Sequence, residues 1–291
     1  MEAPGIDIKG NRSSVRARDL WKKFSKNKLA VIGLIIVVIE IIIALFAPLL
    51  APFDPAEPSY TNVLSSPGRK NLLGTDDLGR DVLSRVIYGS RVSLSAGLIA
   101  VGIALLIGVP VGLISGYYRG FLDEFIIMRF TDAMMSLPSL VLALALSAIL
   151  GAGLKNAMIA IGIIFTPRYI RLVRGEVLSV KEEQYIEAAR SLGMSDLRLI
   201  AKHVLPNITS PIMVQATLNI ATGIIVEAGL SYLGLGTQPP IPSWGTMLSG
   251  GQGYLEQAPW IALSSGMAIF ISVLAFNLVG DGLRDMMDPK E

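Results

Sequence analysis

The side chains that could do chemistry gather in one polar stretch, residues 182–207, in the second half of the chain. It holds acids, bases and the chain's one histidine, His203, between apolar segments. The sequence has no cysteine, which excludes disulfides and thiolate metal sites, and one histidine does not favour a zinc site built by the protein. It also lacks the Gly-x-x-x-x-Gly-Lys-Ser/Thr loop that cradles nucleotide phosphates. These charges therefore favour contact with a partner over catalysis, and we expect no catalytic or metal-binding residue.

The pattern of this stretch predicts a helical hairpin. Residues 182–192 suit a helix, and Gly193 stands where a helix stop needs a left-handed residue. Ser195 is expected to cap a second short helix, with Asp196 in its first turn, where negative charge is favourable. That helix is expected to end before Pro206.

Two other interpretations of the hairpin compete. A helix–turn–helix carrying Arg190, Arg198 and Lys202 could bind DNA. The apolar segments on both sides of the hairpin, predicted below to span a membrane, argue against this, and we expect no nucleic acid. A solvated loop without a partner would contain Gly, Ser and Pro filler in place of two capped helices.

The elements that position the hairpin are predicted to span a membrane. Of the 291 residues 52% are hydrophobic and 16% charged, against roughly 25% charged in soluble domains, and the mean hydropathy is +0.58. A transmembrane helix needs about 20 apolar residues. The sequence predicts an all-α integral membrane protein with about six such helices: 29–50, 92–118, 133–154, 156–167 (extending to 174), 204–226 and 258–280.

The distribution of basic residues predicts the orientation. With the N-terminal arm inside, 19 of the 25 basic residues are cytoplasmic, and six are outside: Arg69, Lys70, Arg80, Arg85, Arg91 and Lys155. This bias agrees with the positive-inside rule, and basic residues also attract anionic membrane lipid. Both termini and the hairpin are therefore expected in the cytoplasm.

One motif of the hairpin resembles a known family. Glu187-Ala188-Ala189, then Gly193, then Leu205-Pro206 is similar to the "EAA" motif of ABC importer permeases, with His203 where the general pattern has isoleucine. The resemblance implies that the hairpin couples the permease to a cytoplasmic ATPase. Glu187 would either hold the two arms together or meet the ATPase. The implied coupling residues are Glu187, Ala188, Ala189, Gly193, Ser195, Asp196, Leu197, Leu205 and Pro206.

Three further segments, 72–94, 230–248 and 276–290, resemble the dipeptide/oligopeptide branch of this family, and its C-type subunit in particular. The resemblance implies a type I ABC importer permease fold in a bacterial or archaeal inner membrane. The implied partners are a homologous B-type permease, two ATPase subunits and an extracytoplasmic solute-binding protein. ATP and Mg would bind to the ATPase chains, and this chain would bind no cofactor. Dipeptides, oligopeptides, nickel chelates and glutathione all stay open as solutes.

The expected organisation has five parts. They are an N-terminal arm (1–28), a first transmembrane helix (29–50), an extracytoplasmic loop (51–91), a five-helix core (92–280) that includes the coupling hairpin (182–206), and a cytoplasmic tail (281–291).

Outside the hairpin, several marked residues have two interpretations each. The outer residues Asp76, Asp77, Arg80, Asp81 and Trp244 would contact a docked solute receptor or serve as scaffold.

Within the membrane, Glu40 would act in transport, pair with a neighbouring subunit or stay protonated. Pro138 and residues 108–110 are expected to bend their helices, and Arg129 is expected to pair with Asp132.

Two other functional classes compete with the importer. A secondary transporter would need more intramembrane charge than Glu40, and a membrane enzyme would need a catalytic set that is not evident.

Overall fold

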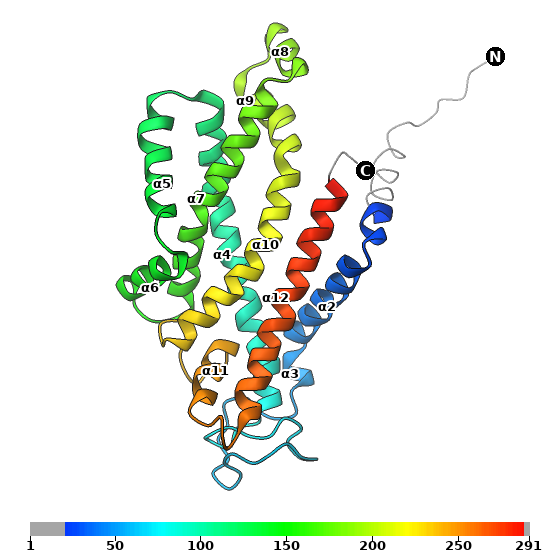
Figure 1. The fold of residues 1–291 in the computed structure, drawn as a ribbon, viewed down its shortest axis with the longest axis vertical. Helices are drawn as coiled ribbons and strands as arrows, with labels where there is room; N and C mark the ends of the chain where they lie inside the picture. The colour runs from blue at the N-terminus through cyan, green and yellow to red at the C-terminus, as the bar shows by residue number, and fades with distance from the viewer. Residues whose placement is uncertain (1–20, 288–291) are drawn as a thin grey trace, which may run out of the picture.

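The structure is a computed structural model that describes residues 21–287, and within that range it is helical apart from loops and one isolated bridge between Thr75 and Asp81 (Figure 1). Residues 1–20 of the expected arm and 288–291 of the expected tail lie outside the described residues. The expectation of an all-α protein is confirmed. The helices are α2 (Lys28–Leu45), α3 (Ala47–Leu50), α4 (Val82–Tyr118), the π-helix η1 (Leu122–Ile127), α5 (Met128–Met135), α6 (Ser139–Leu150), α7 (Leu154–Lys181), α8 (Gln184–Ser191), α9 (Asp196–Leu199), the π-helix η2 (Ile200–Val204), α10 (Leu205–Tyr232), α11 (Trp244–Gln252) and α12 (Pro259–Met287).

The described helices provide five or six membrane crossings. Five are long and apolar enough to span: α2, α4, α7, α12 and the continuous run Asp196–Tyr232. The sixth is the pair Leu122–Met135 and Ser139–Leu150, bent by 100°. The third span, expected at 133–154 with a bend at Pro138, is this broken pair: the bend is confirmed, but the span begins earlier than expected. Pro138 has no backbone N–H to donate, and a residue that precedes proline avoids the helical conformation, so the helix breaks at residues 136–138.

Two other helices are longer than their apolar runs suggest. α4 begins at Val82, because Asp81 caps it by accepting from the Ser84 backbone N–H at 2.8 Å, so the loop before it ends at residue 81. α7 continues to Lys181, although its apolar segment ends near Pro167. The bent pair offers carboxylates to Arg171 and Arg174, described below, and the Ser139 hydroxyl to Arg168.

α4 and α7 share the most extensive contact among the described helices, and a large buried apolar cluster lies around it. Helix axes approach closely in a membrane where small residues recur every fourth position. A Cβ added to the glycines of α4 would lie 2.6–2.8 Å from side-chain Cβ atoms of α7, in the pairs Gly108–Tyr169, Gly112–Val173 and Gly116–Val177. The bend expected at residues 108–110 is not a break, since α4 runs through Pro110 as one helix.

The bundle has two distinct ends (Figure 1). The start of α2, the end of α12 and the hairpin α8–α9 lie at one end, which we name the hairpin end; there Asn27 donates to Asp285 at 2.9 Å. The loop of residues 51–81 and α11 lie at the opposite end, named the loop end.

Candidate functional site

The hairpin turns at Gly193, as expected. Its φ is +80°, in the left-handed region that glycine adopts without a steric penalty. The backbone N–H of Gly193 donates to Arg190 O at 2.9 Å, and that of Met194 donates to Ala189 O at 3.3 Å, which satisfies carbonyls at the end of α8. A Cβ added to Gly193 meets nothing within 4 Å. A substitution there would strain the backbone without a clash inside this chain.

The second arm differs from the prediction in two ways. Ser195 occupies the N-cap position of α9, but its side chain makes no capping hydrogen bond. Helix α9 also does not stop before Pro206, because η2 continues it into α10, where Pro206 lies in the first turn. Pro206 has no N–H to donate, so one helical hydrogen bond is missing at this junction, directly after the π-helical turn η2. The hairpin is thus joined to the membrane helix α10 without a loop.

Tyr117, at the end of α4, anchors both arms. Its hydroxyl donates to Asp196 Oδ1 at 2.5 Å and accepts from Arg190 Nη2 at 3.3 Å. Lys181 Nζ donates to Tyr117 O at 2.6 Å and lies 4.9 Å from the centre of its ring. The hydrogen bond to Tyr117 is the largest cause that raises the pKa of Arg190 above its ordinary value. Tyr117 is not among the residues predicted from the sequence; the available signal was an aromatic residue at the end of a predicted span.

The exposed surface of the hairpin is polar with an apolar tip. Ala189 is buried against the bundle and Leu205 is half-buried. Leu192 is 88% exposed and Leu197 77% exposed, one on each side of the turn at Gly193. The other predicted coupling residues are also exposed: Glu187, Ala188, Gly193, Ser195, Asp196 and Pro206.

Of the two roles considered for Glu187, contact with a partner surface fits the geometry better. Its side chain is exposed, and the hydrogen bonds that connect the two arms in the described chain come from other residues, chiefly Arg190 and Asp196 through Tyr117.

The histidine that departs from the general motif, His203, lies against Tyr185 with ring centres 6.4 Å apart. Asn207 Nδ2 donates to Tyr185 Oη at 3.1 Å and to His203 O at 2.6 Å, so this cluster packs α8 onto α10.

Two ion pairs tie the bent pair to α7 near the hairpin end. Arg174 donates to both carboxylate oxygens of Asp123, at 2.8 and 2.7 Å, and Ser115 also donates to Asp123. Asp132 pairs with Arg171. The expected pairing of Asp132 with Arg129 is therefore wrong: the carboxylate bonds to a guanidinium of the neighbouring helix.

The residues that were predicted to lie outside the membrane are mostly built into the loop-end structure. Asp76 is buried and accepts from Arg80 Nε at 2.7 Å, with Arg85 Nε at 3.4 Å. Asp81, also buried, caps α4 and accepts from Asn71 Nδ2 at 2.8 Å.

Trp244 is buried too and donates to Val86 O at 3.0 Å, whereas the side chain of Asp77 is 39% exposed. Scaffold is therefore the better interpretation of Asp76, Arg80, Asp81 and Trp244.

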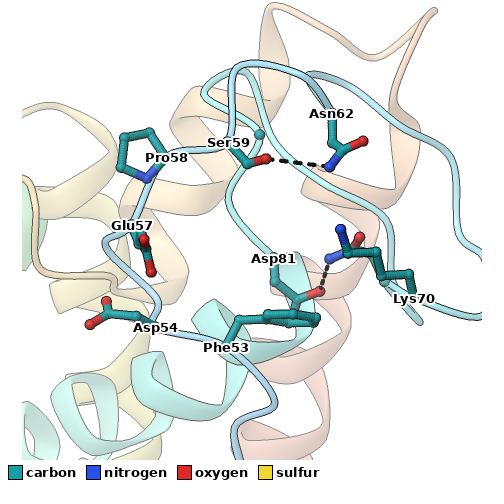
Figure 2. A pocket seen from close by; sticks show the side chains of 10 residues that line it. Phe53, Asp54, Glu57, Pro58, Ser59, Asn62, Lys70 and Asp81 are labelled. Carbon is teal, nitrogen blue, oxygen red and sulfur yellow. Dashed lines mark hydrogen bonds between the residues drawn. The ribbon is translucent and has the colours of Figure 1, made fainter.

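A pocket of about 240 Å³ opens in the loop of residues 51–81 (Figure 2). Asp54 and Glu57 line it, and Asp81 faces it while bonded to Asn71. Among residues 21–287 no group of three or more His, Asp or Glu side chains is placed to hold a metal ion.

The intramembrane acid Glu40 finds a partner within its own chain. Ser272 Oγ of α12 donates to Glu40 Oε1 at 2.6 Å, so one carboxyl oxygen is satisfied between α2 and α12. The other, Oε2, is buried without a partner in the described part of the chain.

The bundle of apolar helices with its polar hairpin has the fold of an ABC importer's transmembrane chain. The structure superposes on a chain of the inward-facing MetNI methionine ABC transporter with a TM-score of 0.58, over 71% of this chain and 98% of that chain, at 20% sequence identity.

The chain belongs to the family described as binding-protein-dependent transport system inner membrane component, whose profile matches residues 108–291. Residues 16–67 match the N-terminal TM domain of oligopeptide transport permease C. The sequence is 48% identical to the dipeptide transport system permease protein DppC of Alkalihalophilus pseudofirmus, over 94% of this chain and 90% of that protein. It is 46% identical to the di/tripeptide permease DppC of Pseudomonas aeruginosa (94% and 92%) and 43% identical to the glutathione permease GsiD of Pectobacterium atrosepticum (94% and 91%).

These findings confirm the predicted family and its C-type branch. The protein is a non-catalytic, multi-pass inner-membrane permease subunit of an ABC importer. A transport system of this family depends on a solute-binding protein and an ATPase.

Proposed function

We propose that this permease carries dipeptides, tripeptides or a similar short peptide such as glutathione, and that its hairpin delivers the work of ATP hydrolysis to the membrane helices. The proposed solute class rests on the names of relatives that are 43–48% identical over nearly the whole chain. The proposed complex contains a homologous B-type permease, two ATPase subunits that hold ATP and Mg, and an extracytoplasmic solute-binding protein.

The observation that carries the coupling role is the contrast between the two faces of the hairpin. One face is fixed to α4, where Arg190 and Asp196 both bond to the hydroxyl of Tyr117. The other presents Leu192 and Leu197 to solvent around the turn at Gly193. A surface that is exposed, apolar and rigidly attached suits a groove on a partner.

The distribution of basic residues supports a side of the membrane for the hairpin. Lys22, Lys23, Lys26 and Lys28 precede or begin α2 at the same end as the hairpin. The positive-inside rule supports a cytoplasmic position for this end, on the side where the proposed ATPases would be. Closure of the ATPase pair would push α8 and α9, and α10 would follow because η2 joins it to α9 without a loop.

Gly193→Val tests the coupling role. The left-handed conformation costs a non-glycine residue on the order of 1 kcal/mol, and a side chain would also enter the partner's groove. We expect normal insertion and abundance, reduced co-purification of the ATPase subunits, and loss of solute-stimulated hydrolysis in proteoliposomes. Gly175→Val is the matched control, because a Cβ there also meets nothing within 4 Å but φ is not left-handed. A Gly193→Val complex that keeps its ATPases and transports at the wild-type rate would refute the coupling role.

A further inference from the structure

A carboxyl group that none of the steps above uses is buried near the loop end of α10. Glu227 is 0% exposed. Ser231 Oγ donates to its Oε1 at 2.6 Å, Thr237 Oγ1 donates to Oε1 at 3.2 Å, and Ser93 Oγ donates to Oε2 at 3.2 Å. The three donors are neutral hydroxyls, and the ion pairs among residues 21–287 all involve other acids.

The partners of Glu227 come from three different segments. Ser93 belongs to α4, Ser231 to α10, and Thr237 to the segment 233–243 that leaves α10. Ser231 Oγ also accepts from the Thr237 backbone N–H at 2.9 Å, so the segment is held at two atoms. We name Ser93, Glu227, Ser231 and Thr237 the Glu227 cluster. It fastens α4, α10 and the segment after α10 at one point.

The fastened segment leads directly into α11, which lies at the loop end between α10 and α12 (Figure 1). Trp244 at the start of α11 donates to Val86 O of α4 at 3.0 Å. The next residue, Gly245, packs so closely on α10 that an added Cβ would lie 2.4 Å from Ala228 O. The Glu227 cluster and α11 are therefore neighbours along α10, and movement of α11 away from α4 has to break or carry the cluster.

Simple packing does not require an acid at this position. α4 and α10 already approach closely beside it, where a Cβ added to Gly223 would lie 3.1 Å from the Gly97 Cα. A buried carboxyl group without a countercharge costs free energy that apolar residues of similar size would avoid. Hydroxyl groups can rotate, however, and can exchange one acceptor for another or for water, which makes such a cluster suited to parting and re-forming.

We infer that Glu227 is a positioning residue. The Glu227 cluster holds α11 and segment 233–243 against α4, and it thereby keeps the loop end closed until solute is admitted there. This inference rests on the proposed transport function, in which the permease opens to one side of the membrane at a time, and not on the coupling role of the hairpin. In this structure the hydrogen bonds of the Glu227 cluster are formed.

The test uses the assembled importer in proteoliposomes and compares Glu227→Ala with Glu227→Gln. The amide keeps an acceptor oxygen and the side-chain volume, so Glu227→Gln should stay within about twofold of wild type. Glu227→Ala releases all three hydroxyls. We expect ATP hydrolysis without the solute-binding protein to rise severalfold and its stimulation by the loaded binding protein to fall severalfold.

A second readout reports the position of α11 directly. The chain has no cysteine, so Met247→Cys, at a position on α11 that is 3% exposed, introduces one thiol. A membrane-impermeant maleimide added from the loop side should label it slowly in the wild-type and Glu227→Gln backgrounds and at least fivefold faster with Glu227→Ala. Should Glu227→Ala fail to assemble, Thr237→Val and Ser93→Ala each remove one bond and should give smaller changes of the same sign.

Unchanged labelling and unchanged stimulation in Glu227→Ala would overturn the inference. If Glu227→Ala does not assemble, the same result in both Thr237→Val and Ser93→Ala would overturn it. So would a Glu227→Gln complex as defective as Glu227→Ala. Gly193→Val separates this outcome from failure of the hairpin assignment, because it should alter ATPase association while the thiol introduced by Met247→Cys stays slow to label.

Discussion

The hydroxyl of Tyr117 donates to the carboxylate of Asp196 at 2.5 Å, across 79 residues of sequence. This bond joins the end of a membrane helix to the first turn of α9, and the same hydroxyl accepts from Arg190 of α8. The two arms of the hairpin thus share a single atom of α4, and a force on either arm reaches the bundle through it.

Tyr117→Phe removes that atom while keeping the ring over which Lys181 lies. We expect a loss of about 1 kcal/mol in hairpin stability, because Asp196 is exposed and can be rehydrated. ATPase subunits should still co-purify, but uptake per ATP hydrolysed should fall severalfold in proteoliposomes. Tyr118→Phe is the matched control, since that neighbouring side chain is 56% exposed. Equal coupling in the two variants would contradict the anchoring role.

Leu197→Asp probes the apolar tip. Burying a leucine contributes about 1.5–3 kcal/mol, so its loss at a docked surface should weaken ATPase binding roughly tenfold or more. Membrane insertion and the melting temperature of the isolated chain should not change, because Leu197 is 77% exposed there. Titration of purified ATPase onto the permease measures the affinity. Leu255→Asp, at a 51% exposed position of the loop end, should leave it unaltered.

Gly112→Val probes the contact of α4 with α7. A Cβ at residue 112 would lie 2.8 Å from Val173 Cβ and 2.9 Å from Ile170 O, so the helices have to separate. Overpacking of this kind costs about 1–3 kcal/mol and should lower the melting temperature of the purified complex. Gly102→Val on the same helix is the control, because an added Cβ there meets nothing within 4 Å. A Gly112→Val protein as stable as this control would show that the two helices are not tightly packed.

Cysteine labelling tests the orientation. Ser195 at the hairpin and Ser66 in the outer loop are both exposed, and the background chain has no thiol. An impermeant maleimide applied to intact cells or spheroplasts should label Ser66→Cys and leave Ser195→Cys unlabelled until the membrane is opened. Ser243 is unsuitable for this purpose, although it lies in an outer loop, because it is fully buried. Labelling of Ser195→Cys from outside would reverse the proposed topology.

Local chemistry was sufficient for several features of this protein. The apolar runs predicted a membrane protein with about six crossings because backbone groups in lipid have to be bonded within the helix. Gly193 was predicted to turn left-handed because the conformational preference of glycine belongs to the residue itself, and its φ of +80° confirms this. The family motifs are likewise strings of neighbouring residues.

Tertiary structure decided which polar groups meet. Asp132 pairs with Arg171 and not with the nearby Arg129, and Trp244 donates to a carbonyl 158 residues away. Ser93 donates a hydrogen bond to Glu227, 134 residues away, and no sequence pattern predicts this pairing. Such partners depend on how helices cross and rotate. That in turn depends on side-chain volumes distributed over the whole bundle, which no short stretch of sequence contains.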